Sequence, residues 1–305
     1  MHINLNVIGN RRTFLGIAVV LIVAAVLAIA VFRFEPGVDF SGGALIKFKM
    51  TGQTSTEEIQ KYFIEELKFP ETRVSYDPAS SSYLARLPGD VSSEHERITT
   101  ETKAKYSGFE EQSFQSIGPS IGAELRKKSI IAMFLVLAGI SLYIAYAFRK
   151  VFRPVSSWKY GWITLFTLFH DVVIPAGLLA VLGHFFGIEI DGNFVVALLV
   201  VMGFSVHDTI VVFDRIRENL VLDRGKSEFG PIINRSVNET LARSINTSLT
   251  LILVLFALYF AGPITLKYFI LTLLVGVITG MYSSVFVASP LLLVWHNWSN
   301  RHKTS

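Results

Sequence analysis

The sequence predicts a membrane α-helical protein with about six transmembrane helices and one α+β domain of the ferredoxin-like class outside the membrane. Two observations lead to this prediction. Of the 305 residues, 51% are hydrophobic and only 17% are charged, whereas soluble domains average about 25% charged residues. The apolar residues are concentrated in long runs, and about 20 consecutive apolar residues suffice to cross a bilayer.

The first apolar run extends from Thr13 to Phe32 and follows two arginines. Its segment Ala28-Ile29-Ala30 resembles a signal-peptide cleavage site. The run continues past this site and is long for a signal sequence, so we expect a retained transmembrane helix. Residues 1–33 then form the N-terminal tail and the first span.

Residues 34–128 are mostly polar and form the predicted outer domain. A Ser or Thr followed three residues later by Glu indicates a helix start, and this pattern occurs at Thr54, Ser55 and Ser93. We expect strands at 44–50, 73–76, 83–87 and 111–117, with helices at 56–67 and 93–106. The resulting βαββαβ order is the split pattern of ferredoxin-like domains.

Five more apolar runs lie between residues 129 and 296, and residues 297–305 form a tail. They cover 130–148, 162–186, 194–213, 246–261 and 266–295. Gly276 and Gly280 have the four-residue spacing that permits close helix packing. We assign them, with Ser283 and Ser284, to packing and to no chemistry.

Basic residues alternate between the linkers and set the predicted orientation. The linker 149–159, the linker after the fourth span and the tail are basic, whereas 187–193 and 262–265 contain no Lys or Arg. The first and last of these basic segments carry Arg149, Lys150, Arg153, Lys159, Arg301 and Lys303. The positive-inside rule then places both termini in the cytoplasm and residues 34–128 in the periplasm. The basic residues 126–128 oppose this orientation, but a long outer domain is largely exempt from the rule.

Residues 218–245 form a predicted cytoplasmic amphipathic segment. Its apolar residues recur near the helical period, and Pro231 suits the first turn of a helix. A helix along the membrane surface and a solvated linker helix are both compatible with this pattern.

Asp208 lies within the fourth span, seven residues before Arg215, which places it roughly 10 Å inside the hydrocarbon. A carboxylate at that depth must be protonated, paired or hydrated. We interpret it as a protonatable ion-relay site, and the alternative is a structural hydrogen bond or ion pair.

Two further groups are candidates for the same relay. His170 and Asp171 lie near the middle of the third span, about 100° apart on a helix, so at most one should point at Asp208. Arg243 precedes the fifth span and either extends to the cytoplasmic surface or pairs with Asp208. Asp171 is a relay candidate or a packing residue.

The composition excludes several classes of site. The chain has no cysteine, so disulfides, zinc–thiolate sites and iron–sulfur clusters are excluded. No nucleotide-binding or hydrolase motif stands out, and we expect no enzymatic activity, no cofactor and no metal. The net charge of +4 is small and gives no reason to expect nucleic acid as a partner.

Four segments resemble motifs of the SecD/SecF family, in particular of its SecF members. Residues 37–43 resemble G-[IV]-D-F-x-G-G, and residues 117–122 resemble V-G-P-x-x-G. Residues 203–219 resemble G-Y-S-x-N-D-T-[IV]-V-[VI]-F-D-R-[IV]-R-E-N, and residues 238–248 continue this stretch. The residues that carry the two glycine motifs are Gly37, Asp39, Phe40, Gly42, Gly43, Gly118, Pro119 and Gly122.

The resemblance implies an RND-like membrane protein with six spans and a periplasmic domain between the first two. It implies a SecD-like partner, association with the SecYEG channel and with YajC and YidC, and use of a proton or sodium gradient to promote preprotein export. The family's intramembrane aspartate and arginine correspond to Asp208 and Arg243. His207 replaces the family's usual Asn, which puts the coupling ion in question because histidine itself titrates near neutral pH.

Two other functions are compatible with the same sequence. One is a passive scaffold of the translocase, in which the charged residues are structural. The other is an ion-coupled exporter of small hydrophobic molecules. The chain contains no second copy of the six-span pattern, so a transporter built of two such halves requires another chain.

Overall fold

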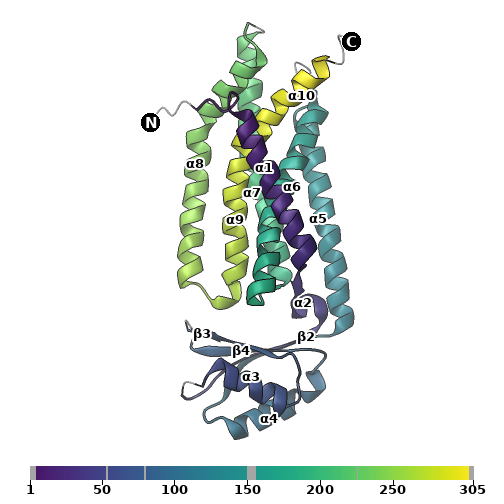
Figure 1. The fold of residues 1–305 in the computed structure, drawn as a ribbon, viewed down its shortest axis with the longest axis vertical. Coiled ribbons are helices and arrows are strands. Elements are labelled where there is room, and N and C mark those ends of the chain that lie inside the picture. Colours follow the sequence, from purple (N-terminus) through teal and green to yellow (C-terminus); the bar gives the residue numbers. More distant parts are fainter. Residues whose placement is uncertain (1–4, 53, 79, 150–155, 225, 302–305) are drawn as a thin grey trace.

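The computed structural model describes residues 5–52, 54–78, 80–149, 156–224 and 226–301. It shows a bundle of long helices with a sheet-and-helix domain at one end, while α1 begins and α10 ends at the opposite end (Figure 1). Lys150, Arg153 and Lys303, which contribute to the predicted orientation, lie outside the described residues.

Within these ranges, six helical segments are long and apolar enough to cross a membrane, as predicted. Their components are α1 (Arg11–Phe32), α5 (Pro119–Ala147), α6 (Ser157–Phe186), α7 (Gly192–Asp223), α8 (Phe229–Ala261), and α9 (Lys267–Ser283) followed by a π-helical turn (Ser284–Ala288) and α10 (Ser289–Arg301). The most apolar window of α6 is 61% buried, against 11% in α1 and α5 and 17% in α8. Helix α6 therefore lies inside the bundle, and the other three helices leave apolar surface exposed.

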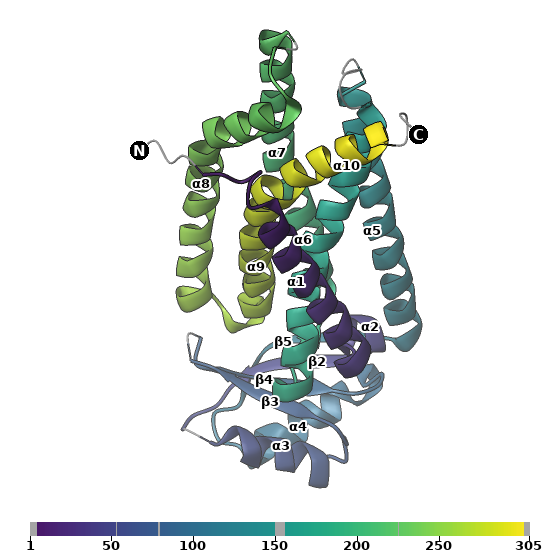
Figure 2. The ribbon, with the colours of Figure 1, turned by 45° about the horizontal axis from the view of Figure 1, so that its top comes forward.

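The predicted segment 218–245 is divided between two long helices. Residues up to Asp223 continue α7, and α8 begins at Phe229 with Pro231 in its first turn. The helices are interrupted where Arg224 adopts a left-handed conformation with φ of 52°. The first part of α8 runs across the end of the bundle before the helix turns along it (Figure 2).

The outer domain has the predicted βαββαβ order. Its elements are β2 (Gly43–Lys49), α3 (Thr56–Glu65), β3 (Arg73–Asp77), β4 (Ser82–Leu87), α4 (His95–Lys105) and β5 (Glu110–Ile117). The strands form an antiparallel sheet in the order β3-β4-β2-β5. Ala44, Ile46 and Phe48 alternate along β2 and are buried in one core with residues of α3 and α4.

The two predicted helix starts of this domain have different outcomes. Ser55 caps α3, because its hydroxyl accepts a hydrogen bond from the Glu58 N–H at 3.2 Å. The expected cap at Ser93 is wrong. A 3₁₀ turn spans Ser92–Glu94, and α4 begins at His95 without a side-chain cap.

Candidate functional site

Asp208 is buried between α7 and α8. Its carboxylate accepts one hydrogen bond, from the Ser248 hydroxyl of α8 at 3.3 Å. His207 Nδ1 lies 3.9 Å from Asp208 Oδ1, but the His207 side chain is 69% exposed. Among the described residues, no Lys or Arg forms an ion pair with Asp208. Burial of an ionisable group without a Lys or Arg partner is energetically costly.

Of the two alternatives for Arg243, the pair with Asp208 is not formed in this structure. Ser244 and Ser248 are buried on the side of α8 that faces α7, whereas Arg243 is exposed. Arg243 precedes Ser244 by one position and is rotated from it by about 100°. The guanidinium is therefore presented to the outside of this chain.

Asp171 forms a second buried polar site, and its hydrogen-bond partners were not predicted from the sequence. Its carboxylate accepts hydrogen bonds from His170 Nδ1 at 2.7 Å, from the Ser283 hydroxyl at 2.7 Å and from the Ser205 hydroxyl. Both His170 and Asp171 have fully buried side chains. This second site joins α6, α7 and α9, and neither His170 nor Asp171 contacts Asp208.

The two serines assigned to packing alone, Ser283 and Ser284, make specific hydrogen bonds, so that assignment is corrected. Ser284 begins the π-helical turn, and its hydroxyl shares a hydrogen bond with Thr209 at 2.8 Å, one residue after Asp208. Single π-helical turns occur frequently at functional sites. The hydroxyl groups of Thr209 and Ser284 thus join α7 to the π-helical turn, and both also lie within hydrogen-bonding distance of the Ser205 carbonyl.

The packing assignment of the two glycines agrees with the structure. A Cβ atom on Gly276 would lie 2.2 Å from Val201 Cγ2, and one on Gly280 would lie 3.0 Å from Ser205 Cβ. Helix α9 therefore approaches α7 closely, which brings Ser283 and Ser284 within hydrogen-bonding distance of α6 and α7.

Comparison with known proteins establishes the family. The family model for the protein export membrane protein SecD/SecF, C-terminal, matches residues 97–298. The chain is 38% identical over 304 residues to the protein translocase subunit SecF of Thermobaculum terrenum, covering 96% of this chain and 94% of that protein. The chain belongs to the SecD/SecF family of protein-export membrane proteins. It is also 33% identical to SecF of Anaerolinea thermophila, with 98% and 97% of the two chains covered.

Solved structures of the family have the same fold. The crystal structure of SecDF from Thermus thermophilus, described as a translocon-associated membrane protein, matches with a TM-score of 0.82 at 30% identity. The match covers 97% of this chain and 39% of that chain. A SecDF structure in a super-membrane-facing form matches with a TM-score of 0.72 at 31% identity, covering 40% of its chain. This SecF-family chain thus spans about two fifths of each SecDF chain.

The glycine motifs form the junction between the outer domain and the bundle. Gly42 and Gly122 are in close contact, because a Cβ on Gly122 would lie 3.0 Å from Gly42 N. A Cβ on Gly42, which has a φ of +79°, would lie 2.9 Å from the Pro119 Cα. Phe40 is buried beside them. Four residues of the two motifs are therefore packed together where the sheet-and-helix domain meets the bundle, namely Phe40, Gly42, Pro119 and Gly122.

The same junction holds the start of α7. The Gly37 N–H donates to the Ile190 carbonyl at 2.8 Å, and the Gly192 N–H donates to Asp39 Oδ2 at 2.7 Å. Strand β1 (Glu35–Pro36) pairs in parallel with β6 (Glu189–Ile190), which precedes α7. The sequence did not indicate this pairing.

Two arginines of the sheet strengthen the junction. Glu189 forms ion pairs with Arg86 and, at 3.4 Å, with Arg73. The Arg73 guanidinium also donates to the Gly187 carbonyl at 3.0 Å. Burial lowers the pKa of Arg86 from its ordinary value. The face of the sheet that carries these arginines is thus attached to the connection between α6 and α7.

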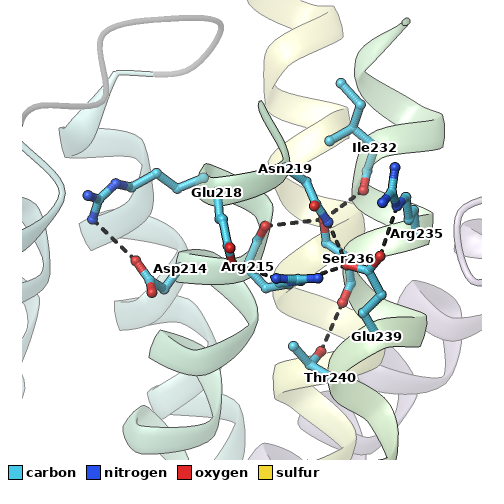
Figure 3. A network of polar contacts seen from close by, with 10 residues as sticks. Asp214, Arg215, Glu218, Asn219, Ile232, Arg235, Ser236, Glu239 and Thr240 are labelled. Atoms are coloured by element: carbon cyan, nitrogen blue, oxygen red, sulfur yellow. Dashed lines mark hydrogen bonds and ion pairs between the residues drawn. The ribbon is translucent and has the colours of Figure 1, made fainter. Parts of the chain in front are cut away.

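The polar residues of the long SecF motif tie α7 to α8 at the other end of the bundle (Figure 3). Glu239 accepts hydrogen bonds from Arg215 at 2.6 Å, Asn219 at 2.7 Å and Arg235 at 2.8 Å. Asn219 also donates to the Ser236 hydroxyl at 2.9 Å. Arg215 and Arg235 were considered in the sequence only as basic residues of the linker after the fourth span, and their pairing with Glu239 was not predicted. The i,i+4 spacing of Arg235 and Glu239 was a signal for part of it.

Proposed function

We propose that this SecF-family chain is an auxiliary subunit of the Sec protein translocase that uses an ion gradient to promote preprotein export. Its relatives over the whole chain are named protein translocase subunit SecF. The observation that carries the ion-coupled part of this proposal is the buried, singly hydrogen-bonded Asp208 carboxyl group. Its ionisation is costly without a countercharge, so binding of a proton or sodium ion changes the balance of forces between α7 and α8.

The proposed arrangement in the membrane follows the positive-inside rule. Residues 1–33 contain the cytoplasmic N-terminus and the first span, 34–128 form a periplasmic domain that we infer to be ferredoxin-like, and 129–296 hold the other spans. The tail 297–305 is cytoplasmic. The location is the bacterial inner membrane, with lipid around the exposed apolar helices.

A SecD-like subunit is the proposed direct partner. The Thermus thermophilus and Bacillus subtilis relatives named SecDF match this chain over only 39% and 37% of their length, so they contain a second large part. His207 and Arg243 are exposed in this chain, beside or near the Asp208 site. We propose that the partner covers this face and completes the ion site there. The SecYEG channel, YajC, YidC and the preprotein are the further proposed partners.

The proposed cycle begins when Asp208 binds an ion from one side of the membrane and ends when it releases the ion to the other side. Arg243, His207 and Asp171 tune the affinity of the site. One elementary charge crossing about 100 mV supplies roughly 2.3 kcal/mol. A few ions per stroke suffice to bias the periplasmic domain, which holds the emerging polypeptide, between two positions.

The test is secretion in cells whose only copy carries Asp208→Asn. Asp214→Asn is the matched control, because Asp214 lies on the same helix and pairs with Arg217 at the surface. We expect the Asp208 variant to co-purify with its partner while preproteins accumulate, and the control to secrete normally. Normal secretion by an assembled Asp208→Asn complex would establish the scaffold function instead. Drug sensitivity without preprotein accumulation would establish a small-molecule exporter.

A further inference from the structure

The pair of His170 and Asp171 is buried at the centre of the bundle and is not explained by the Asp208 site. Asp171 is the fifteenth of the 30 residues of α6, so it lies about 20 Å from either helix end. Both side chains are fully buried. An ionisable group at such a depth is expensive and requires a specific reason.

The hydrogen bonds of the pair surround the carboxyl group with polar partners. Asp171 accepts from His170 and from the hydroxyl groups of Ser205 and Ser283. Three donors directed at one carboxyl group stabilise its ionised form. Among the described residues, no Lys or Arg forms an ion pair with Asp171. An ionised Asp171 beside a neutral imidazole would therefore leave one uncompensated charge in the bundle core.

A protonated imidazole would supply the missing charge. When His170 Nδ1 donates to Asp171, a neutral ring carries a bare lone pair on Nε2. This Nε2 atom is buried and has no hydrogen-bond partner in the part of the chain that the structure describes. One proton on Nε2 converts the ring to imidazolium and makes the pair electrically neutral.

We propose that His170 and Asp171 form a proton-binding site separate from Asp208. His170 Nε2 takes up one proton from the aqueous phase, and Asp171 remains the fixed countercharge. Release of that proton restores the neutral imidazole. The role of this site in export rests on the proposed ion-coupled function, whereas proton binding itself does not.

The helices that pack against α6 determine which charged and titratable side chains surround the pair. Tyr282 of α9 stacks over the His170 ring at 6.1 Å between centroids. Helix α7 contributes Ser205 as a ligand, with His207 and Asp208 on its following turn. Helices α1 and α5 carry their charged residues near their first turns, and α10 contributes His296. These charged residues are Arg11, Arg12, Glu124, Arg126, Lys127 and Lys128.

The position of the site connects proton binding to helix packing. Asp171 holds α6, α7 and α9 together through Ser205 and Ser283, and Ser283 directly precedes the π-helical turn. A change in the charge of the pair alters the strength of both hydroxyl hydrogen bonds. The packing of α7, which carries Asp208, against α6 and α9 is thereby sensitive to a second proton.

The test uses histidine-selective ¹⁵N magnetic resonance of the full chain with its SecD-like partner in liposomes, titrated with pH. We expect one ring signal that changes from neutral imidazole to imidazolium and is lost in His170→Gln. The same transition should persist in Asp208→Asn, while in Asp171→Asn the His170 ring should remain neutral over the same pH range. His184→Gln, on the same helix, is the matched control and should leave the His170 signal unchanged.

The outcomes separate this inference from the proposed function. If the His170 ring keeps one form at every pH at which the complex stays folded, or titrates identically in Asp171→Asn, the proton site is refuted. That result leaves the Asp208 proposal standing if Asp208→Asn blocks export. If His170 titrates as expected but Asp208→Asn exports normally, the proton site stands and the ion-coupled function fails.

Discussion

Replacement of Asp39 by Ala tests how the outer domain is attached to the helix that carries Asp208. Asp39 Oδ2 accepts a hydrogen bond from the N–H of Gly192, the first residue of α7, at 2.7 Å. The substitution removes a charged acceptor and a favourable charge at a helix N-terminus. Such a hydrogen bond contributes about 1.5–3 kcal/mol, and the interaction with the helix dipole contributes about 0.3–1 kcal/mol.

Part of this loss is recovered, because Asp191 also caps α7 by accepting from the Phe194 N–H at 2.9 Å. We therefore expect the first turn of α7 to open more easily by about 1–3 kcal/mol, which corresponds to roughly 5–150-fold faster amide exchange. Asp39→Asn keeps an acceptor oxygen and loses only the charge, so its effect should stay below about 1 kcal/mol.

The assay is hydrogen exchange followed by mass spectrometry of the full chain in lipid nanodiscs. Peptides covering residues 192–195 report the opening, and peptides near Asp223 serve as the internal reference. Asp90→Ala is the matched control, because Asp90 accepts from the Ser92 N–H within the same domain and lies far from α7 in the chain. Unchanged exchange at 192–195 in Asp39→Ala would refute the cap, most clearly if Asp191→Ala accelerates it.

Two further predictions concern the contacts of α7 with its neighbours. In thermal unfolding, Gly276→Ala should destabilise the folded chain by about 1–3 kcal/mol, because the new Cβ would lie 2.2 Å from Val201 Cγ2. Gly203→Ala should leave the stability unchanged in the same measurement, because a Cβ at Gly203 meets nothing within 4 Å. Glu239→Ala should lower the stability of the folded chain by about 1–3 kcal/mol, because it removes the acceptor that Arg215, Asn219 and Arg235 share. Glu218→Ala removes an exposed ion pair and should lower the stability by less than about 1 kcal/mol. Equal losses of stability in the two glycine variants would contradict the packing assignment. Equal losses in the two glutamate variants would contradict the hydrogen-bond assignment.

The six helices and the βαββαβ order were predictable because both follow from local patterns. Length and apolar composition determine which segments can span a bilayer, and short alternating strands between helical segments indicate the domain. The β1–β6 pair could not be found in this way. It joins two residues at 35–36 with two at 189–190, and segments so short carry no periodic signal.

The polar interior was predicted only in part, for a geometric reason. A serine in an apolar helix either permits close packing or donates a hydrogen bond, and the sequence does not distinguish the two. The close approach of α9 to α7 directs Ser283 to Asp171. Likewise the residue types allowed Arg243 to pair with Asp208, but the rotation of α8 presents Ser248 to Asp208 instead.

Helix α7 connects every feature for which a function is proposed. Its first residue is bonded to Asp39 of the outer domain, and its last turns are tied to α8 through Arg215 and Asn219. Asp208 lies between these attachments, about 24 Å along the helix from Gly192 and about 10 Å from Arg215. Under the proposed ion-coupled function, a force that arises at Asp208 on ion binding would therefore act on both attachments. The hydrogen bond to Asp39 connects the start of α7 to the glycine motif at which β2 begins. The sheet-and-helix domain is therefore the element on which that force would act.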